Sequence, residues 1–393
     1  PHGQPVRRRG DVPGLRVVLR PGDRQREPGT VSRERQDPSE MFVRRAIQRY
    51  LRRRRSDSTD SSVEAWKYRL KLFREWCYGI DLKRVGELRG LDFDEYYEIR
   101  AGEVAPVTLE GEMWTLRMFV KYLEQIDAVE RGLHESVRIP ELDRDERASQ
   151  EALDAEPALA LIDYFRNSDR DRAKRNHAFL ELAWYTGARQ SGLRSLDLRD
   201  VNYRLDSDEQ SWIEFHNRES TGPRLKNGVR GERPVGIPDE TARVISEYVR
   251  DYRMDTHDDE GRQPLLSTRE GRPAEATVRT WSYNATLPCL HGACPHGKEK
   301  DTCVWTDYHK ASKCPSSRSP HPIRTGSITW QLNIGIPPEV VAERVNATVS
   351  TIEDHYDWAS DEERWQRYRD RLGKRREYVE RLDSDWSNHD DDK

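Results

Sequence analysis

The sequence predicts a mainly α-helical protein with one small β-sheet, an α+β fold that is divided into two domains. Three observations lead to this prediction. A chain of 393 residues is longer than one ordinary domain needs. Apolar residues recur at three- and four-residue spacings through most of the chain, as they do in helices with one buried face. A short patch at 201–237 reads instead as strands around a turn rich in Gly, Asn and Lys.

Composition and charge narrow the class of protein. Charged residues make up 35% of the chain, apolar residues 34%, and the formal net charge is −4. Net charge therefore does not by itself predict a nucleic-acid-binding protein, although the plentiful arginine suits contact with phosphate. A GC-rich genome would also explain the preference for arginine over lysine. The chain lacks both the ~20 consecutive apolar residues of a membrane span and a signal-peptide core, so we expect a soluble, cytoplasmic protein.

The N-terminal part predicts a tail followed by a helical domain. Residues 1–40 show no helical or strand period, which predicts a disordered tail. Met41 is a candidate for the true first residue, and the alternative, a basic arm that contacts nucleic acid, is favoured by the run Arg52–Arg55. The helical domain should span 41–145, with helices at 57–79, 92–101 and 107–127 and a linker at 140–153.

The remainder predicts a second domain at 146–365 and a charged C-terminal tail at 366–393. The last segment, 361–393, should begin as a charged helix and end in a disordered stretch, DSDWSNHDDDK. We expect strands at Trp212–His216 and Arg233–Ile237. The expected helices lie at 155–166, 171–186, 238–253, 274–285, 324–334, 337–345 and 349–355.

Three separated segments carry residues suited to chemistry on an anion. Arg189 follows a helix that should end at Gly187. His321 and Arg324 stand three residues apart near a helix start, so both face one side, where the positive end of the helix favours a phosphate. Tyr356 ends a short helix that follows a turn rich in Ser and Thr.

In this order and spacing the segments TGAR, HPIR and the terminal tyrosine resemble the tyrosine recombinase (phage integrase) family. The stretches SPHPIRTGSITWQLN and RVNATVSTIEDHYD are most similar to archaeal, halophile-type integrases of mobile elements. The resemblance covers about 154–358, and 57–127 more weakly. It implies that 41–145 is a helical core-binding (SAM-like) DNA-binding domain and that 146–365 is a catalytic domain which breaks and rejoins DNA.

The resemblance also implies roles for single residues. Arg189 and Arg324 would hold the scissile phosphate, His321 would act as a base or phosphate donor, and Tyr356 would form a 3′-phosphotyrosyl bond. A lysine on a β-hairpin protonates the leaving oxygen in this family, and Lys226 is the one lysine between Lys174 and Lys298. Catalysis would need no cofactor. The expected partner is double-stranded DNA bound by a homo-tetramer, with a monomer in solution as the alternative.

The sequence departs from the family at two positions. Gly192 stands where the family often has Glu, and Ala347 stands where it usually has His or Trp. The neighbouring Asn346 is an alternative donor to the phosphate. These departures keep open a catalytically silent DNA-binding protein of the same fold, and type IB topoisomerase-like relaxation of DNA is a further alternative.

A cysteine-rich insert at 289–314 predicts a structural zinc site. Four cysteines crowd into a polar loop that joins the HPIR segment, and four thiolates suit tetrahedral zinc. The expected ligands are Cys289, Cys294, Cys303 and Cys314. His296 is a substitute ligand if one cysteine is not used, and reduced thiols without metal are the alternative. Cys77 is expected to be a core residue.

Overall fold

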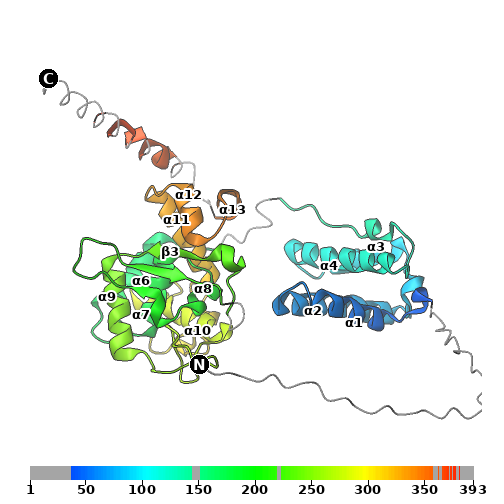
Figure 1. Ribbon diagram of the computed structural model, residues 1–393, viewed down its shortest axis with the longest axis horizontal. Coiled ribbons are helices and arrows are strands. Elements are labelled where there is room, and N and C mark those ends of the chain that lie inside the picture. Colours follow the sequence, from blue (N-terminus) through cyan, green and yellow to red (C-terminus); the bar gives the residue numbers. More distant parts are fainter. Residues whose placement is uncertain are drawn as a thin grey trace, which may run out of the picture. The chain divides into compact units, whose positions relative to one another are not determined.

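A computed structural model of the chain describes residues 37–143, 151–218 and 223–356, together with short stretches between 362 and 380. The chain divides into two compact units, Pro1–Glu141 and Leu142–Lys393 (Figure 1). Residues 1–36 of the tail predicted at 1–40, much of the predicted linker and the end of the C-terminal tail lie outside the described residues. The end of the predicted N-terminal tail is ordered instead, since Pro38–Glu40 forms a 3₁₀ helix capped by Asp37.

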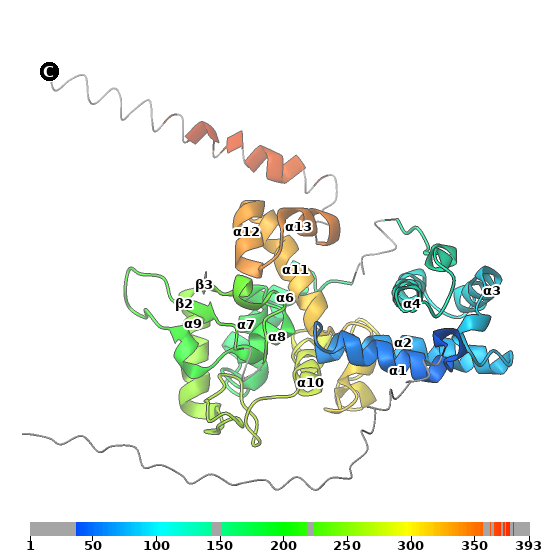
Figure 2. The ribbon, with the colours of Figure 1, turned by 45° about the vertical axis from the view of Figure 1, so that its right-hand side comes forward.

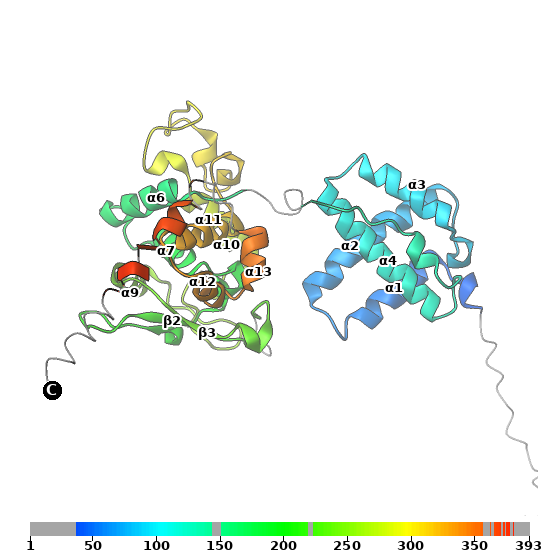
Figure 3. The same ribbon diagram turned by 90° about the horizontal axis from the view of Figure 1, so that it is seen from above.

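The first unit is a bundle of helices around an aromatic core (Figure 3). Its helices are α1 (Val43–Arg54), α2 (Asp60–Gly79), α3 (Gly90–Ala101) and α4 (Pro106–Gln125). The side chain of Thr59 accepts a hydrogen bond from the Ser62 amide and caps α2, and Pro106 occupies the first turn of α4. Cys77 lies in the core as predicted, where burial raises the pKa of its thiol to about 12.

The second unit is built around α7, which is buried along most of its length. Helices α6, α9, α10 and α11 pack against it (Figure 2). The helices of this unit are α6 (Ala155–Asn167), α7 (Arg175–Thr186), α8 (Gln190–Ser195), α9 (Asp239–Glu247), α10 (Glu275–Ala285), α11 (Pro320–Asn333), α12 (Pro338–Val345) and α13 (Val349–His355). Among the described helices of both units, none is long and apolar enough to span a membrane.

A three-stranded antiparallel sheet in the order β1-β2-β3 lies beside these helices. Its strands are β1 (Val201–Asn202), β2 (Trp212–Phe215) and β3 (Arg233–Gly236). Ile213 pairs with Val235 and Phe215 with Arg233. The predicted strands differ from β2 and β3 by one residue each. The predicted helix at 238–253 ends as α9 at Glu247 and continues as a π-helical turn, Tyr248–Tyr252.

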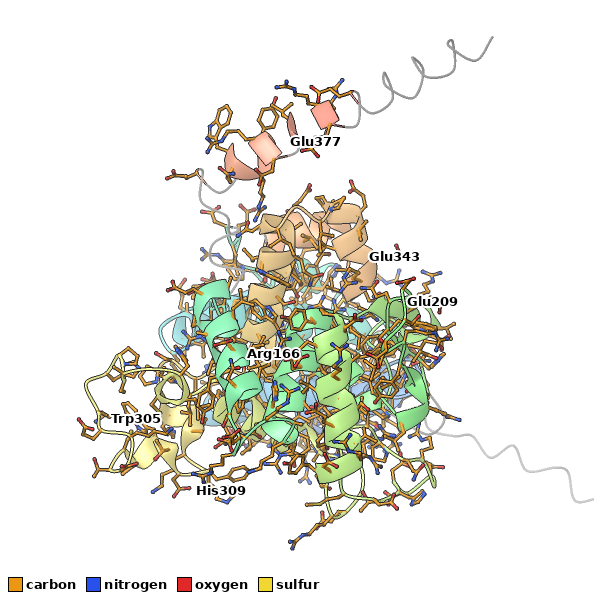
Figure 4. The ribbon with its side chains drawn as sticks, turned by 90° about the vertical axis from the view of Figure 1, so that its left-hand side faces the viewer. Arg166, Glu209, Trp305, His309, Glu343 and Glu377 are labelled. Atoms are coloured by element: carbon orange, nitrogen blue, oxygen red, sulfur yellow. The ribbon has the colours of Figure 1, made fainter. Side chains whose placement is uncertain are left out.

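A buried carboxylate on α7 ties three helices together. The Glu181 oxygens accept hydrogen bonds from Arg166 Nε on α6 at 2.7 Å and from Thr241 Oγ1 on α9 at 2.8 Å. His177, also buried, lies 3.2 Å from the same carboxylate. Burial would raise the pKa of Glu181, but these hydrogen bonds outweigh it and lower the pKa. Figure 4 labels Arg166 at this junction.

The last helices form a small core of their own. Side chains of α11, α12 and α13 surround it, including Ile328, Val341, Ile352 and the ring of Tyr356. The predicted start of α11 at residue 324 is wrong, because the helix begins at Pro320 after the N-cap Ser319. Pro320 and Pro322 are accommodated in the first turn, where backbone N–H groups have no partner within the helix.

The close packing of α11 against the segment before α6 predicts that Gly326 tolerates no side chain. A Cβ at Gly326 would lie 1.8 Å from the carbonyl oxygen of Leu153, whose own amide donates to the Pro322 oxygen at 3.0 Å. We expect Gly326→Ala to lower the free energy of unfolding by about 3 kcal/mol, since the backbones must separate. Unfolding in urea measures this difference in the free energy of unfolding. Gly292→Ala is the matched control, because a Cβ there meets nothing within 4 Å; equal midpoints for the two variants would contradict this packing.

Candidate active site

Arg189 is placed by a glycine turn at the end of α7. Gly187 adopts a left-handed conformation with φ 57°, and a Cβ there would lie 2.9 Å from the Val345 side chain. The chain then turns into α8, with Arg189 as its N-cap. Arg189 is half-buried, and its Nη1 donates to the carbonyl oxygen of Asn346 at 2.7 Å. Burial lowers the pKa of Arg189, while nearby Tyr356 opposes that shift.

Arg324, on α11, is one of the largest fully buried side chains. Its Nη1 donates to the carbonyl oxygens of Gly187 at 2.6 Å and Val345 at 2.9 Å. Its Nη2 is buried and has no hydrogen-bond partner among the described residues. Burial lowers the pKa of Arg324 to about 10. A buried guanidinium with an unused donor is suited to hold an anion.

Tyr356 ends α13 beside Arg324. Its hydroxyl oxygen accepts a hydrogen bond from Arg324 Nε at 3.3 Å, and its carbonyl accepts one from Thr329 Oγ1 at 2.7 Å. The ring centroid lies 5.3 Å from the Arg324 guanidinium carbon and 5.9 Å from the ring centroid of His321. His321 is exposed, whereas Arg324 is buried. The structure therefore brings Arg189, His321, Arg324 and Tyr356 together.

Arg233, at the start of β3, joins this group although the sequence did not single it out. Its Nε donates to the carbonyl of Arg344 at 2.6 Å, and its guanidinium lies 4.4 Å from the ring centroid of Phe215. Burial, together with the nearby charges of Arg324 and Arg189, lowers the pKa of Arg233 to about 9. The sequence did contain a signal for Arg233. Side chains alternate between the two faces of a strand, so Arg233 lies on the same, core-facing side of β3 as the buried Val235 two residues later.

Within the described part of the chain, the arginines of the site have no acidic partner. Among the described residues, none of Arg189, Arg233, Arg324 and Arg344 forms an ion pair; each donates to backbone carbonyls instead. Partly or fully buried cations that lack a counter-ion repel one another and are costly to leave without an anion. The cluster therefore has the charge of an anion-binding site, with the Tyr356 hydroxyl at its edge.

Three consecutive carbonyls at the C-terminal end of α12 orient these side chains. The oxygen of Arg344 accepts from Arg233, that of Val345 from Arg324, and that of Asn346 from Arg189. The end of a helix exposes carbonyls without partners in the helix and carries partial negative charge. We call this group the α12 carbonyl cluster.

Lys226 lies on an exposed turn between β2 and β3, just before a 3₁₀ helix at Gly228–Gly231. The next residue, Asn227, donates from Nδ2 to the side-chain oxygen of Asn346 at 3.0 Å. The turn that carries Lys226 therefore contacts the residue that holds Arg189.

The two departures from the family pattern are accommodated without a polar side chain. Gly192 is buried, and a Cβ there would be in ordinary contact with Phe215 at 3.4 Å, so a glutamate would place its carboxylate against this ring. Ala347 is partly buried against the small core of α11, α12 and α13.

The cysteine-rich insert forms a loop at one edge of the second unit, where Figure 4 labels Trp305 and His309. Cys314 is buried, while Cys289, Cys294 and Cys303 are partly exposed. Burial raises the pKa of Cys289, and the Cys294 and Cys314 thiols raise it further. His296 lies 3.0 Å from the Ser316 hydroxyl. Within the described ranges, no three His, Cys, Asp or Glu side chains are arranged to hold a metal ion, so zinc stays a prediction.

Neither a protein-family model nor a curated protein sequence matches the chain. Among solved structures, the N-terminal domain of a phage integrase/site-specific recombinase from Haloarcula marismortui matches over 97% of its length. That match has 42% identity, covers 25% of this chain and has a TM-score of 0.25.

Two longer structures match most of the chain. The XerH site-specific recombinase bound to palindromic difH substrate has a TM-score of 0.60 at 12% identity, covering 82% of this chain and 93% of its own. The Tn1549 transposon integrase in complex with transposon right end DNA has a TM-score of 0.57 at 12% identity, covering 85% of this chain and all of its own. At 12% identity, the similarity between this chain and these two proteins shows a shared fold.

The acid-free arginine cluster predicts that an inorganic anion stabilises the folded protein. We expect sulfate at ten times its dissociation constant to add about 1.4 kcal/mol, since it binds the folded state alone. Arg233→Met should weaken this effect. Arg243→Met is the control, because Arg243 is exposed on α9 and lies beside Asp206 and Glu240. The stabilisation is measured by thermal unfolding in sulfate and in sodium chloride of equal ionic strength. If sulfate stabilises the Arg233→Met variant as much as the unmodified protein, the arginine cluster is not the anion-binding site.

Proposed function

Because this chain has the fold of the tyrosine recombinases, we propose that it is a site-specific DNA recombinase or integrase. It cleaves and rejoins double-stranded DNA through a covalent bond between Tyr356 and a 3′-phosphate. The proposal rests mainly on the position of the tyrosine hydroxyl, which lies at hydrogen-bond distance from Arg324. The surrounding arginines have no acidic partner among the described residues, and Arg324 keeps one donor without a partner there.

In the first step the Tyr356 oxygen attacks the scissile phosphorus in line with the leaving 5′-oxygen. The P–O5′ bond breaks as the bond from phosphorus to Tyr356 forms. Arg189 and Arg324 neutralise the two non-bridging oxygens, and Arg324 Nη2 offers the donor that the protein leaves unused. Arg233 adds positive charge from β3.

Two protons move during this step. His321 accepts the proton that Tyr356 loses, and the hydrogen bond from Arg324 Nε stabilises the negative charge on the tyrosine oxygen. Lys226 gives a proton to the leaving 5′-oxygen, so the cleaved strand ends in a hydroxyl. A 5′-hydroxyl from another strand then attacks the phosphotyrosine and restores the phosphodiester. The bond energy is retained, so the reaction needs neither ATP nor a catalytic cofactor.

The partner of the reaction is duplex DNA, and we propose a homo-tetramer as the recombining assembly. The XerH and Tn1549 proteins, which share this fold, are bound to DNA in their solved structures. Relaxation of supercoiled plasmid without exchange of strands would favour the type IB topoisomerase-like alternative. Binding without cleavage would favour the catalytically silent one.

We further propose that the insert 289–314 holds one structural zinc ion through Cys289, Cys294, Cys303 and Cys314, with His296 as substitute ligand. The Cys294 and Cys314 thiols help to raise the pKa of Cys289, which supports the proximity of these three residues. The ligands must draw closer together when the metal binds, since the described side chains are not yet arranged around one point.

Metal content tests the zinc proposal. Native mass spectrometry should find about one zinc per chain, and Cys303→Ser should lower it. Chelation should lower the thermal midpoint, since zinc binding stabilises the folded loop. Cys77→Ala is the control, because Cys77 lies in the first unit and should leave the zinc content unchanged. A metal-free protein purified with zinc present would contradict the proposal.

Covalent trapping tests the recombinase proposal. A nicked duplex, built from direct repeats that flank the gene, should trap a protein–DNA adduct on a denaturing gel. Tyr356→Phe should abolish the adduct and leave DNA binding within about twofold, because one hydroxyl is lost from a phosphate-dominated interface. Peptide mapping should place the DNA on Tyr356. Absence of an adduct from the unmodified protein on a site that it binds would support the silent alternative.

A further inference from the structure

Asn346 is the one residue that contacts both the Lys226 turn and the Arg189 side chain among the described residues. Its backbone carbonyl accepts from Arg189 Nη1 at 2.7 Å, and its side-chain oxygen accepts from Asn227 Nδ2 at 3.0 Å. Gly231, at the other end of the turn, comes so close that a Cβ there would lie 2.6 Å from Asn346 Nδ2. Asn346 thus contacts the turn at both ends of the 3₁₀ helix, at its N-cap Asn227 and at its last residue Gly231.

A helix cap alone does not explain the side chain of Asn346. The residue ends α12 with φ 52°, a left-handed conformation that glycine adopts most readily. Glycine would therefore serve the cap as well as asparagine does. The asparagine side chain bonds outside its own helix, to a residue 119 positions earlier in the chain.

We propose that Asn346 is a positioning residue that holds the Lys226 turn in register with the arginines of the site. This inference rests on the proposed recombinase function and adds a residue to it. The Lys226 side chain is exposed, so little else restrains where its ammonium group points. By joining Asn227 to the α12 carbonyl cluster, Asn346 keeps the proton donor and the phosphate clamp in a fixed relation, which general acid catalysis requires.

The neighbouring contact at Arg233 supports the same arrangement. Arg233 donates to the Gly231 carbonyl at 2.8 Å and to the Arg344 carbonyl at 2.6 Å. It ties the far end of the turn to the same helix end that Asn346 occupies. Two bridges therefore span the turn and α12, and Asn346 forms the one closer to Lys226 in sequence.

The test uses Asn346→Gly in the full chain, which removes the side chain and keeps the backbone conformation. Two nicked substrates are compared in single-turnover cleavage: the ordinary phosphodiester, and one with sulfur in place of the leaving 5′-oxygen. A thiolate leaves without a proton because its pKa is far below that of an alcohol. We expect Asn346→Gly to slow cleavage of the ordinary substrate about threefold to tenfold, the range of one net hydrogen bond. Cleavage of the sulfur substrate should be at the rate of the unmodified protein.

Four further single variants and one double variant make the result specific. Lys226→Ala should be slow on the ordinary substrate and restored on the sulfur substrate, whereas Tyr356→Phe should cleave neither. Asn227→Ala should match Asn346→Gly, and the double variant should be no slower than either single one, because the two side chains act as a pair. Asp206→Gly is the matched control, a left-handed residue at φ 60° on an exposed turn, and should leave both rates unchanged.

The outcomes separate the inference from the function on which it rests. If the Asn346→Gly variant cleaves the ordinary substrate at the rate of the unmodified protein, the positioning role is overturned. Equal slowing on both substrates also overturns it, because the defect would then lie outside proton donation. Failure of the sulfur substrate to restore Lys226→Ala refutes Lys226 as the proton donor and the inference with it. If the unmodified protein forms no covalent adduct with DNA, the recombinase function itself is refuted.

Discussion

The C-terminal end of α12 is the constraint on which the geometry of the site depends. Three carbonyls that the helix cannot satisfy internally accept hydrogen bonds from arginines of three separate segments, β3, α11 and the turn after α7. A neutral carbonyl orients a guanidinium but does not cancel its charge. The arginines are therefore fixed in place while their charge remains available to an anion, which a carboxylate partner would not allow.

The chain separates its structural arginines from those of the site by partner type. Arg166 pairs with the buried Glu181 at 2.7 Å, and Arg272 pairs with Asp258 at 2.9 Å, so these side chains hold the fold together. Arg189 and Arg324 donate to carbonyls instead. A net charge of −4 thus conceals a local excess of positive charge, because none of the described acidic residues forms an ion pair with the arginines of the site.

Nucleophile and anion site are linked through a short stretch of chain. The α12 carbonyl cluster and Tyr356 lie ten to twelve residues apart on either side of α13, and the tyrosine ring completes the small core of α11, α12 and α13. Arg324 reaches the turn at Gly187, the carbonyl of Val345 and the tyrosine hydroxyl together. A displacement of α12 would therefore disturb the phosphate clamp and the nucleophile at once.

The fold class, most helices, both longer strands and the group Arg189, His321, Arg324 and Tyr356 could be predicted from the amino-acid sequence. Local periodicity reports which face of an element is buried, and ordered motifs report chemistry, so neither needs coordinates. Three features became apparent from the folded chain: α11 begins at Pro320, Arg233 joins the arginines of the site, and Asn346 bridges to Asn227. The Arg233–Arg344 and Asn227–Asn346 contacts join residues more than 100 positions apart, and no local pattern encodes such pairings. Period-two alternation places Arg233 on the core side of its strand but does not identify the residues that it contacts there. The start of α11 depends on how two prolines fit its first turn.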